Sequence, residues 1–177
     1  MDVLSFISNL LGLVCVLLAS LIKGERIKTT LFFVCLGNVL IAAGYLFAGN
    51  GFHCAASGLV AGVLTVINFF LQSKGRPLPR WLIAVYAPLM IAVNLLVGDL
   101  SRLTLLAVLA CMAFVLSIFQ ANGRGYRLCV LFNTATWSVY DALSHAWNGL
   151  ATHVVLFAFT LLGALVWDRK SKQKGDA

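Results

Sequence analysis

Long apolar runs alternate with short polar stretches along the whole chain. A helix that crosses a bilayer needs about 20 predominantly apolar residues, and seven runs of 17–20 residues reach or approach that length. They are Val3–Ile22, Thr29–Ala48, Phe52–Leu71, Trp81–Val97, Leu103–Phe119, Leu128–Ala146 and Gly149–Trp167. The pattern therefore predicts an all-α integral membrane protein with seven transmembrane helices.

The thirteen Lys and Arg residues are distributed unevenly between the two ends of these runs. When chain ends and loops are assigned alternately to two sides, twelve fall on one side and only Arg102 on the other. The twelve are Lys23, Arg26, Lys28, Lys74, Arg76, Arg80, Arg124, Arg127, Arg169, Lys170, Lys172 and Lys174. Because cytoplasmic loops collect Lys and Arg, we expect the amino terminus outside and the carboxyl terminus inside.

The composition narrows the class of protein and its partners. With 61% hydrophobic and 11% charged residues, the chain does not have the composition of a soluble domain. The net charge is +7, and the Lys and Arg residues behind it lie just beyond predicted helix ends, almost all on one side. This position indicates contact with anionic lipid headgroups and not with nucleic acid. The five cysteines stand singly, without a C-x-x-C pair, so we expect no metal site and no cofactor.

Two stretches of the chain resemble each other. Asn38 and Tyr45 are seven positions apart in the second run, and Asn133 and Tyr140 have the same spacing in the sixth. Each stretch follows basic residues and precedes an Asn-Gly pair, Asn50-Gly51 or Asn148-Gly149, which we read as a short turn. The match indicates that the last three helices repeat the first three.

Repeats that begin four helices apart point the same way through a membrane, so one helix must link them. We therefore expect a first three-helix repeat (1–73), an inner loop with a linker helix (74–98), a second repeat (99–168) and a basic cytoplasmic tail (169–177). Parallel repeats of this kind form one class of transporter architecture, in which the solute binds near the bilayer midplane.

The sixth run carries polar and aromatic residues at steps of three and four. They are Asn133, Trp137, Tyr140, Asp141, Ser144, His145 and Asn148. This spacing puts them on one stripe of a helix with 3.6 residues per turn. Since polar groups inside a bilayer are costly unless they face protein or water, the stripe is predicted to face the interior of the bundle.

Asp141 and His145 are four residues apart and close enough on a helix to pair. As a functional site, they would form a proton-sensitive pair at the outer mouth of a solute path, because histidine titrates near neutrality. As a structural feature, they would simply order the outer end of the helix.

Asn133 and Trp137 are expected to lie deeper in the membrane. An amide that donates and accepts, beside a flat indole, suits a hydroxylated or heterocyclic solute. We extend this candidate solute site to Tyr140 and to Asn38 and Tyr45, the corresponding residues of the first repeat. The alternative is that the asparagines hold helices together by hydrogen bonds.

Two further groups of residues have less specific patterns. His53, His145 and His153 lie near predicted outer helix ends, but their spacing matches no metal or haem motif, and histidines are common at the interface. Gly58 and Gly62 form a G-x-x-x-G pair that permits close helix approach, either within a repeat or between subunits of a homo-oligomer.

The two repeated stretches, GERIKTTLFFVCLGNVLIAAGYLFAGNG and GRGYRLCVLFNTATWSVYDALSHAWNGL, resemble the YgjV-like family of bacterial inner-membrane proteins. That family is similar to the wider group of SWEET, PQ-loop and PnuC-type carriers with three-plus-one-plus-three helices. The resemblance implies location in the bacterial inner membrane and transport of a small polar solute by rocking of the two helix triplets.

This chain also departs from the carrier group. It has no Pro-Gln pair, no proline in the predicted triplet helices, and no asparagine in the seventh run to match Asn68. A sugar site or a proline hinge is therefore not expected. We expect a transporter or facilitator, with a non-transporting scaffold or regulatory subunit as the alternative. No nucleophile–base pair or paired-carboxylate motif indicates an enzyme.

Overall fold

In the computed structural model, the described residues are 3–21, 27–49, 51–73, 78–98, 100–120 and 123–175. Within these ranges every regular element is helical, which confirms the all-α prediction. The elements are α1 (Val3–Leu21), α2 (Ile27–Ala48), α3 (Phe52–Ser73), the 3₁₀ turn η1 (Arg80–Leu82), α4 (Ile83–Val97), α5 (Arg102–Ile118), α6 (Gly123–Leu143) and α7 (Trp147–Gly175).

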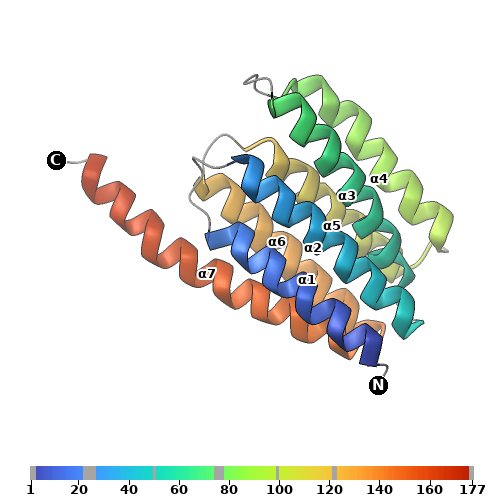
Figure 1. Cartoon of the computed structure of the whole chain (residues 1–177). Helices are drawn as coiled ribbons and strands as arrows, with labels where there is room; N and C mark the ends of the chain where they lie inside the picture. The colour runs from blue at the N-terminus through green and yellow to red at the C-terminus, as the bar shows by residue number, and fades with distance from the viewer. Residues whose placement is uncertain are drawn as a thin grey trace.

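The helices lie side by side, and successive helices run in opposite directions (Figure 1). Helix α2 packs against both α1 and α3, and α6 packs against both α5 and α7. Helix α4 packs against α3 and α5, while α7 returns to pack against α1. The contacts therefore close a ring in which α2 and α6 are each the middle helix of a trio.

The two ends of the bundle differ in their basic residues. The chain starts at one end, here called the N-terminal end, which also holds residues 49, 51, 98, 100, 101 and 144–146. At the opposite, basic end lie Arg80, Arg124 and Arg127, whereas Arg102 lies at the N-terminal end. Lys23, Arg26, Lys74, Arg76 and Asn50 of the sequence argument lie outside the described residues.

Four helices of the described chain are long and apolar enough to cross a membrane. The qualifying segments are Leu31–Ala48, Phe52–Leu71, Arg80–Val97 and Trp147–Leu165. Helices α1 and α5 contribute shorter apolar segments, Val3–Ala19 and Arg102–Ile118. Helix α6 falls outside both groups because its apolar residues are interrupted by the polar residues of the predicted stripe.

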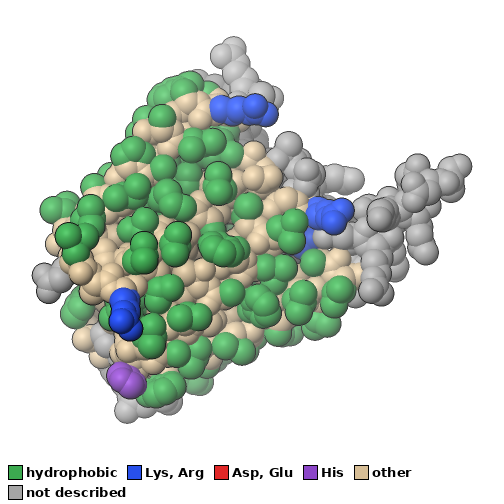
Figure 2. All heavy atoms as spheres, turned by 180° about the vertical axis from the view of Figure 1, so that it is seen from behind, with side chains coloured by type: hydrophobic (Ala, Val, Ile, Leu, Met, Phe, Trp, Pro, Cys, Tyr) green, Lys and Arg blue, Asp and Glu red, His purple; other side chains and the backbone are tan. Residues whose placement is uncertain are grey.

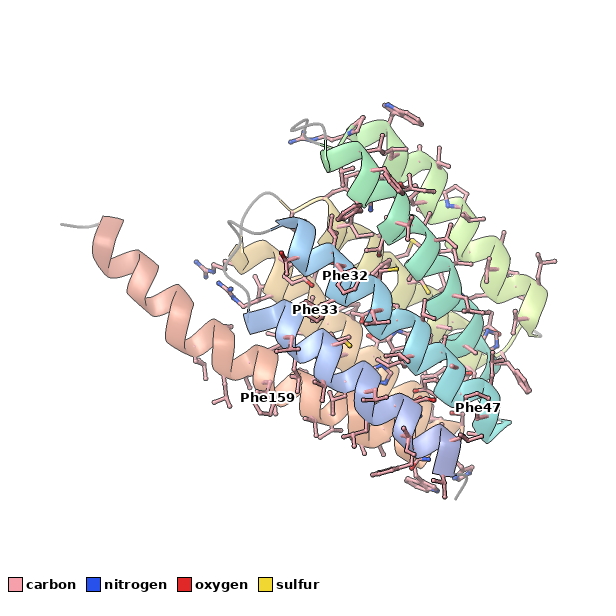
Figure 3. The ribbon with its side chains drawn as sticks, viewed as in Figure 1. Phe32, Phe33, Phe47 and Phe159 are labelled. Carbon is pink, nitrogen blue, oxygen red and sulfur yellow. The ribbon has the colours of Figure 1, made fainter. Side chains whose placement is uncertain are left out.

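The outer surface carries the apolar side chains that a lipid-facing protein needs. Hydrophobic side chains cover most of the face in Figure 2, and blue Lys and Arg side chains lie toward its ends. Phe32 of α2 and Phe159 of α7, labelled in Figure 3, are 58% and 48% exposed. Large apolar side chains exposed on several helices are typical of a membrane protein and not of a soluble monomer.

Glycines bring the helices of the first trio close together. A Cβ on Gly37 would lie 2.5 Å from Val16 Cγ2 and 3.1 Å from the carbonyl oxygen of Gly12, so α1 and α2 approach at their backbones. A Cβ on Gly58 would lie 3.1 Å from Ala42 Cβ, and the equivalent position on Gly62 would contact α2 as well. The Gly58 and Gly62 surface thus packs against α2 within the chain.

The two Asn-Gly pairs of the sequence repeat differ in local structure. Gly51 has a φ of 66° and belongs to the connection between α2 and α3. Asn148 and Gly149 instead lie in the first turn of α7, which begins at Trp147. A turn was predicted at both places, but Gly51 precedes α3, whereas Asn148 and Gly149 lie inside α7, which begins one residue before them.

We predict that Gly37→Ala lowers the free energy of unfolding by about 1–3 kcal/mol, because the added methyl group overpacks the α1–α2 contact. The matched control is Gly163→Ala, whose Cβ would have its nearest neighbour 3.9 Å away, at Arg127 Cδ. Since alanine favours a helix over glycine, the control should hold or raise stability. Thermal unfolding in detergent measures both, and equal effects would contradict the close approach.

Candidate functional site

The carboxylate of Asp141 lies buried at the N-terminal end of the bundle and is held by two side chains. The Tyr45 hydroxyl donates to Oδ1 at 2.6 Å, and Nδ1 of His153 lies 2.7 Å from Oδ2. Asp141 is fully buried, and His153 and Tyr45 are nearly so. Tyr45, Asp141 and His153, here called the Asp141 cluster, thus use both carboxylate oxygens in short, strong hydrogen bonds.

Three helix ends bring this cluster together. Tyr45 lies one turn before the end of α2, Asp141 lies two residues before the end of α6, and His153 lies in the second turn of α7. Because neighbouring helices are antiparallel, the end of α6 and the start of α7 lie at the same level as the end of α2. The Tyr45–Asp141 bond therefore joins the middle helices of the two trios across the ring.

Aromatic rings surround the cluster. Trp137, one turn before Asp141, stacks on His153 with ring centroids 6.1 Å apart and an interplanar angle of 14°. The Trp137 ring also meets Tyr140 edge-on at 5.2 Å, and Tyr140 meets His53 edge-on at 5.9 Å. These rings are almost completely buried, so they exclude water from the carboxylate in this conformation.

A second set of polar contacts adjoins the first through His53. The two ring nitrogens of His53 lie 3.3 Å from Asn94 Oδ1 and 3.4 Å from Thr104 Oγ1. Asn94 also donates to Ser57 Oγ at 3.0 Å. Since His53, Asn94 and Thr104 belong to α3, α4 and α5, this set ties α4 to both of its neighbours.

Helix α1 joins the same level of the bundle. Ser5 donates to the carbonyl oxygen of Gly44 at 2.8 Å, and Asn148 Nδ2 lies 3.5 Å from Ser5 Oγ. With these contacts, side chains from all of helices α1–α7 take part in polar or ring contacts at the N-terminal end. We call this set the polar belt: Ser5, Tyr45, His53, Ser57, Asn94, Thr104, Trp137, Tyr140, Asp141, Asn148 and His153.

Glycines make room for two members of the belt. A Cβ on Gly149 would overlap the Tyr45 hydroxyl, and a Cβ on Gly51 would overlap the Tyr45 ring. A Cβ on Gly98 would likewise overlap the imidazole of His53. Because Gly51 and Gly149 have no side chain, Tyr45 has the space that it needs to reach Asp141.

The structure brings together only part of the predicted solute site. Trp137, Tyr140 and Tyr45 meet in the belt, but Asn133 and Asn38 do not belong to it. Asn133 is half-buried and donates to the carbonyl oxygen of Ala110 on α5 at 2.7 Å. Asn38 is half-buried near the middle of α2, where its backbone carbonyl oxygen, and not its side-chain amide, packs against Gly58.

The histidine that pairs with Asp141 is His153 and not His145. Helix α6 ends at Leu143, and His145 adopts a left-handed φ of 58° in the turn that follows. A helical spacing of four therefore no longer applies, and the exposed His145 ring contacts Trp147 instead. The sequence placed His153 near an outer helix end, but its partner depends on how α7 packs against α6.

The described side chains form no group of three or more His, Cys, Asp and Glu residues that could hold a metal ion. The three histidines that share this end have different surroundings, since His53 contacts Asn94, His153 contacts Asp141 and His145 is exposed. The site is therefore a set of hydrogen-bonding and aromatic groups around one carboxylate.

No family model matches the chain, and neither a curated protein nor a solved structure matches it. The resemblance to the YgjV-like family accordingly stays a prediction, and the function must be argued from the geometry of this chain.

We predict that His153→Ala lowers the free energy of unfolding by about 3–5 kcal/mol, because it leaves the buried carboxylate of Asp141 with one partner fewer. His145→Asn is the control, since asparagine tolerates the left-handed conformation and an exposed change costs about 0.5 kcal/mol or less. Chemical denaturation in detergent compares the two variants. A larger loss from the His145 variant would contradict the observed pairing.

Proposed function

We propose that this protein is a transporter or facilitator for a small polar solute in the bacterial inner membrane. In this proposal all seven helices cross the membrane, with the amino terminus outside and the carboxyl terminus inside. Helices α1–α3 and α5–α7 form two parallel repeats joined by α4, and the two trios rock against each other to give alternating access.

The packing of the helices supports the repeat. Helices α2 and α6 hold the same middle place in their trios, and α4 lies between the last helix of one trio and the first of the other. Tyr45 and Tyr140, which correspond in the sequence repeat, are both buried near the same end of the bundle. Arg102 stands apart from the basic end, as the expected orientation requires.

The hydrogen bond between Tyr45 and Asp141 is the observation that carries the transport proposal. It joins the two trios at the N-terminal end, whereas Asn133, near the middle of α6, bonds to α5 within its own trio. Contacts between the trios at one end act as a gate, because separating them opens that end without unfolding either trio. The structure then corresponds to a state closed at the outer end.

A buried amide toward the basic end supports a polar solute. Asn68 of α3 accepts from the Tyr86 hydroxyl at 2.9 Å, while its buried Nδ2 has no hydrogen-bond partner among the described residues. Since a buried unpaired donor is costly, a solute hydroxyl or carbonyl, or a water molecule, would stabilise this position. Together with the indole of Trp137, it favours an uncharged polar solute.

A non-transporting scaffold is the second candidate, and one observation favours it. Asn94 makes contacts with Ser57, Met90 and Cys111, so its buried amide is used by the protein itself. Side chains that satisfy each other in this way need no solute. The two candidates differ in whether the trios separate during the protein's activity.

Counterflow in proteoliposomes, run with labelled amino acids, sugars and nucleosides, tests transport directly. For a solute that the wild type carries, Trp137→Ala should reduce flux at least about tenfold, the loss expected when about 1.4 kcal/mol of binding or gating energy disappears. Trp147→Ala is the matched control, because Trp147 is 62% exposed, and flux should stay within about twofold.

Two results would count against transport by this site. Equal flux in the wild type and Trp137→Ala would remove Trp137 from the solute path. No flux of any solute class, with all proteins monodisperse, would favour the scaffold.

The orientation has its own test. A single cysteine at Leu100, which is 92% exposed at the N-terminal end, should react with a membrane-impermeant maleimide added outside intact spheroplasts. A cysteine added after Ala177 should react only after permeabilisation. The reverse labelling pattern would show that the amino terminus faces the cytoplasm and would contradict the proposed orientation.

A further inference from the structure

We propose that Asp141 and His153 together bind one proton when the N-terminal end of the bundle is closed. The geometry that points to this is a fully buried carboxylate 2.7 Å from an imidazole nitrogen. The proposal rests on the proposed function in one respect: it assumes that the two trios separate at the Tyr45–Asp141 hydrogen bond.

The groups that face Asp141 come from several helices. Tyr45 reaches it from α2, Cys54 lies near it from α3, and His153 reaches it from α7. Tyr140 of α6 lies near Asp141, and its ring meets His53 of α3 edge-on. Of the described side chains, His153 is the one that forms an ion pair with Asp141, and it does so only when protonated.

The other neighbouring helices contribute uncharged groups to this end of the bundle. Helix α1 supplies Ser5 and α4 supplies Asn94, while Thr104 of α5 faces His53. Arg102 lies at the same end but is exposed. The described surroundings of Asp141 therefore provide hydrogen bonds but no permanent positive charge.

A negative charge without a counter-charge is costly to bury, and the penalty exceeds what one additional hydrogen bond returns. Tyr45 stabilises the carboxylate, but that single contact does not replace the lost hydration. One added proton makes the Asp141–His153 pair neutral, either as carboxylate and imidazolium or as carboxylic acid and imidazole. Both forms keep the hydrogen bond between Oδ2 and Nδ1.

Opening the N-terminal end changes this balance. Tyr45 moves away with the first trio, while Asp141 and His153 stay together on the second. Water then reaches the carboxylate and hydrates its charge, so the pair can release its proton. By linkage, closing takes up one proton, and acidic conditions stabilise the closed end.

The test compares two single cysteines in a cysteine-free background in nanodiscs. Thr152→Cys places a thiol beside His153 at a position that is 4% exposed, and Leu100→Cys gives a fully accessible thiol at the same end. The ratio of their maleimide reaction rates cancels the pH dependence that the two thiols share, and the Asp141→Asn variant measures what remains. We expect this ratio to fall at least about tenfold between pH 9 and pH 5, because one linked proton changes an equilibrium by up to tenfold per pH unit.

Two variants assign the effect to the cluster. Asp141→Asn imitates the neutral acid, so its ratio should stay low and independent of pH. Tyr45→Phe removes the Tyr45–Asp141 hydrogen bond between the trios but keeps the proton-binding pair, so its ratio should rise at every pH and keep the slope. Tyr45→Phe also keeps the test informative if Asp141→Asn fails to assemble.

A wild-type ratio that stays within about twofold across this range would overturn the proposal, since one linked proton predicts a larger change. A slope that survives in Asp141→Asn, or is lost in Tyr45→Phe, would overturn it too. The transport proposal and the proton proposal can fail separately. If the labelling ratio has the expected pH slope but no solute is carried, the transport proposal is wrong and the proton site stands.

Discussion

Asp141 is buried where the two helix trios meet, and the rest of the N-terminal end is arranged around that carboxylate. Tyr45 supplies a donor from the first trio and His153 a partner from the second. Trp137 covers the imidazole, while glycines leave the space that Tyr45 needs. The cost of burying a carboxylate thus explains why so many polar and aromatic groups gather at one level of an otherwise apolar bundle.

The uneven distribution of polar contacts along the bundle gives the proposed mechanism its direction. The polar contacts between the trios at the N-terminal end include the short Tyr45–Asp141 hydrogen bond, whereas the close glycine contacts between α1 and α2 lie within one trio. In the first trio the helices approach at their backbones, and a few side-chain contacts join the two trios at the N-terminal end. In the proposed mechanism, the bundle separates at this end while each trio keeps its internal packing.

Much of the fold could be predicted because it depends on local properties of the chain. The seven apolar runs correspond to the seven described helices, and their ends differ by no more than five residues except at Gly175, where α7 ends eight residues beyond its run. The stripe on the sixth run was recognised from its spacing, and Trp137, Tyr140 and Asp141 do face the interior. The prediction failed for His145, because the helical spacing behind it ended at Leu143.

By itself, the sequence determined where helices form, which end is basic and which residue is the buried acid, since run length, charge and periodicity are properties of neighbouring residues. Only the tertiary structure decided what Asp141 contacts. Its partners lie 96 and 12 residues away, on helices whose rotation and level are set by packing against several neighbours at once. A hydrogen bond requires an alignment within tenths of an ångström, which no local pattern specifies.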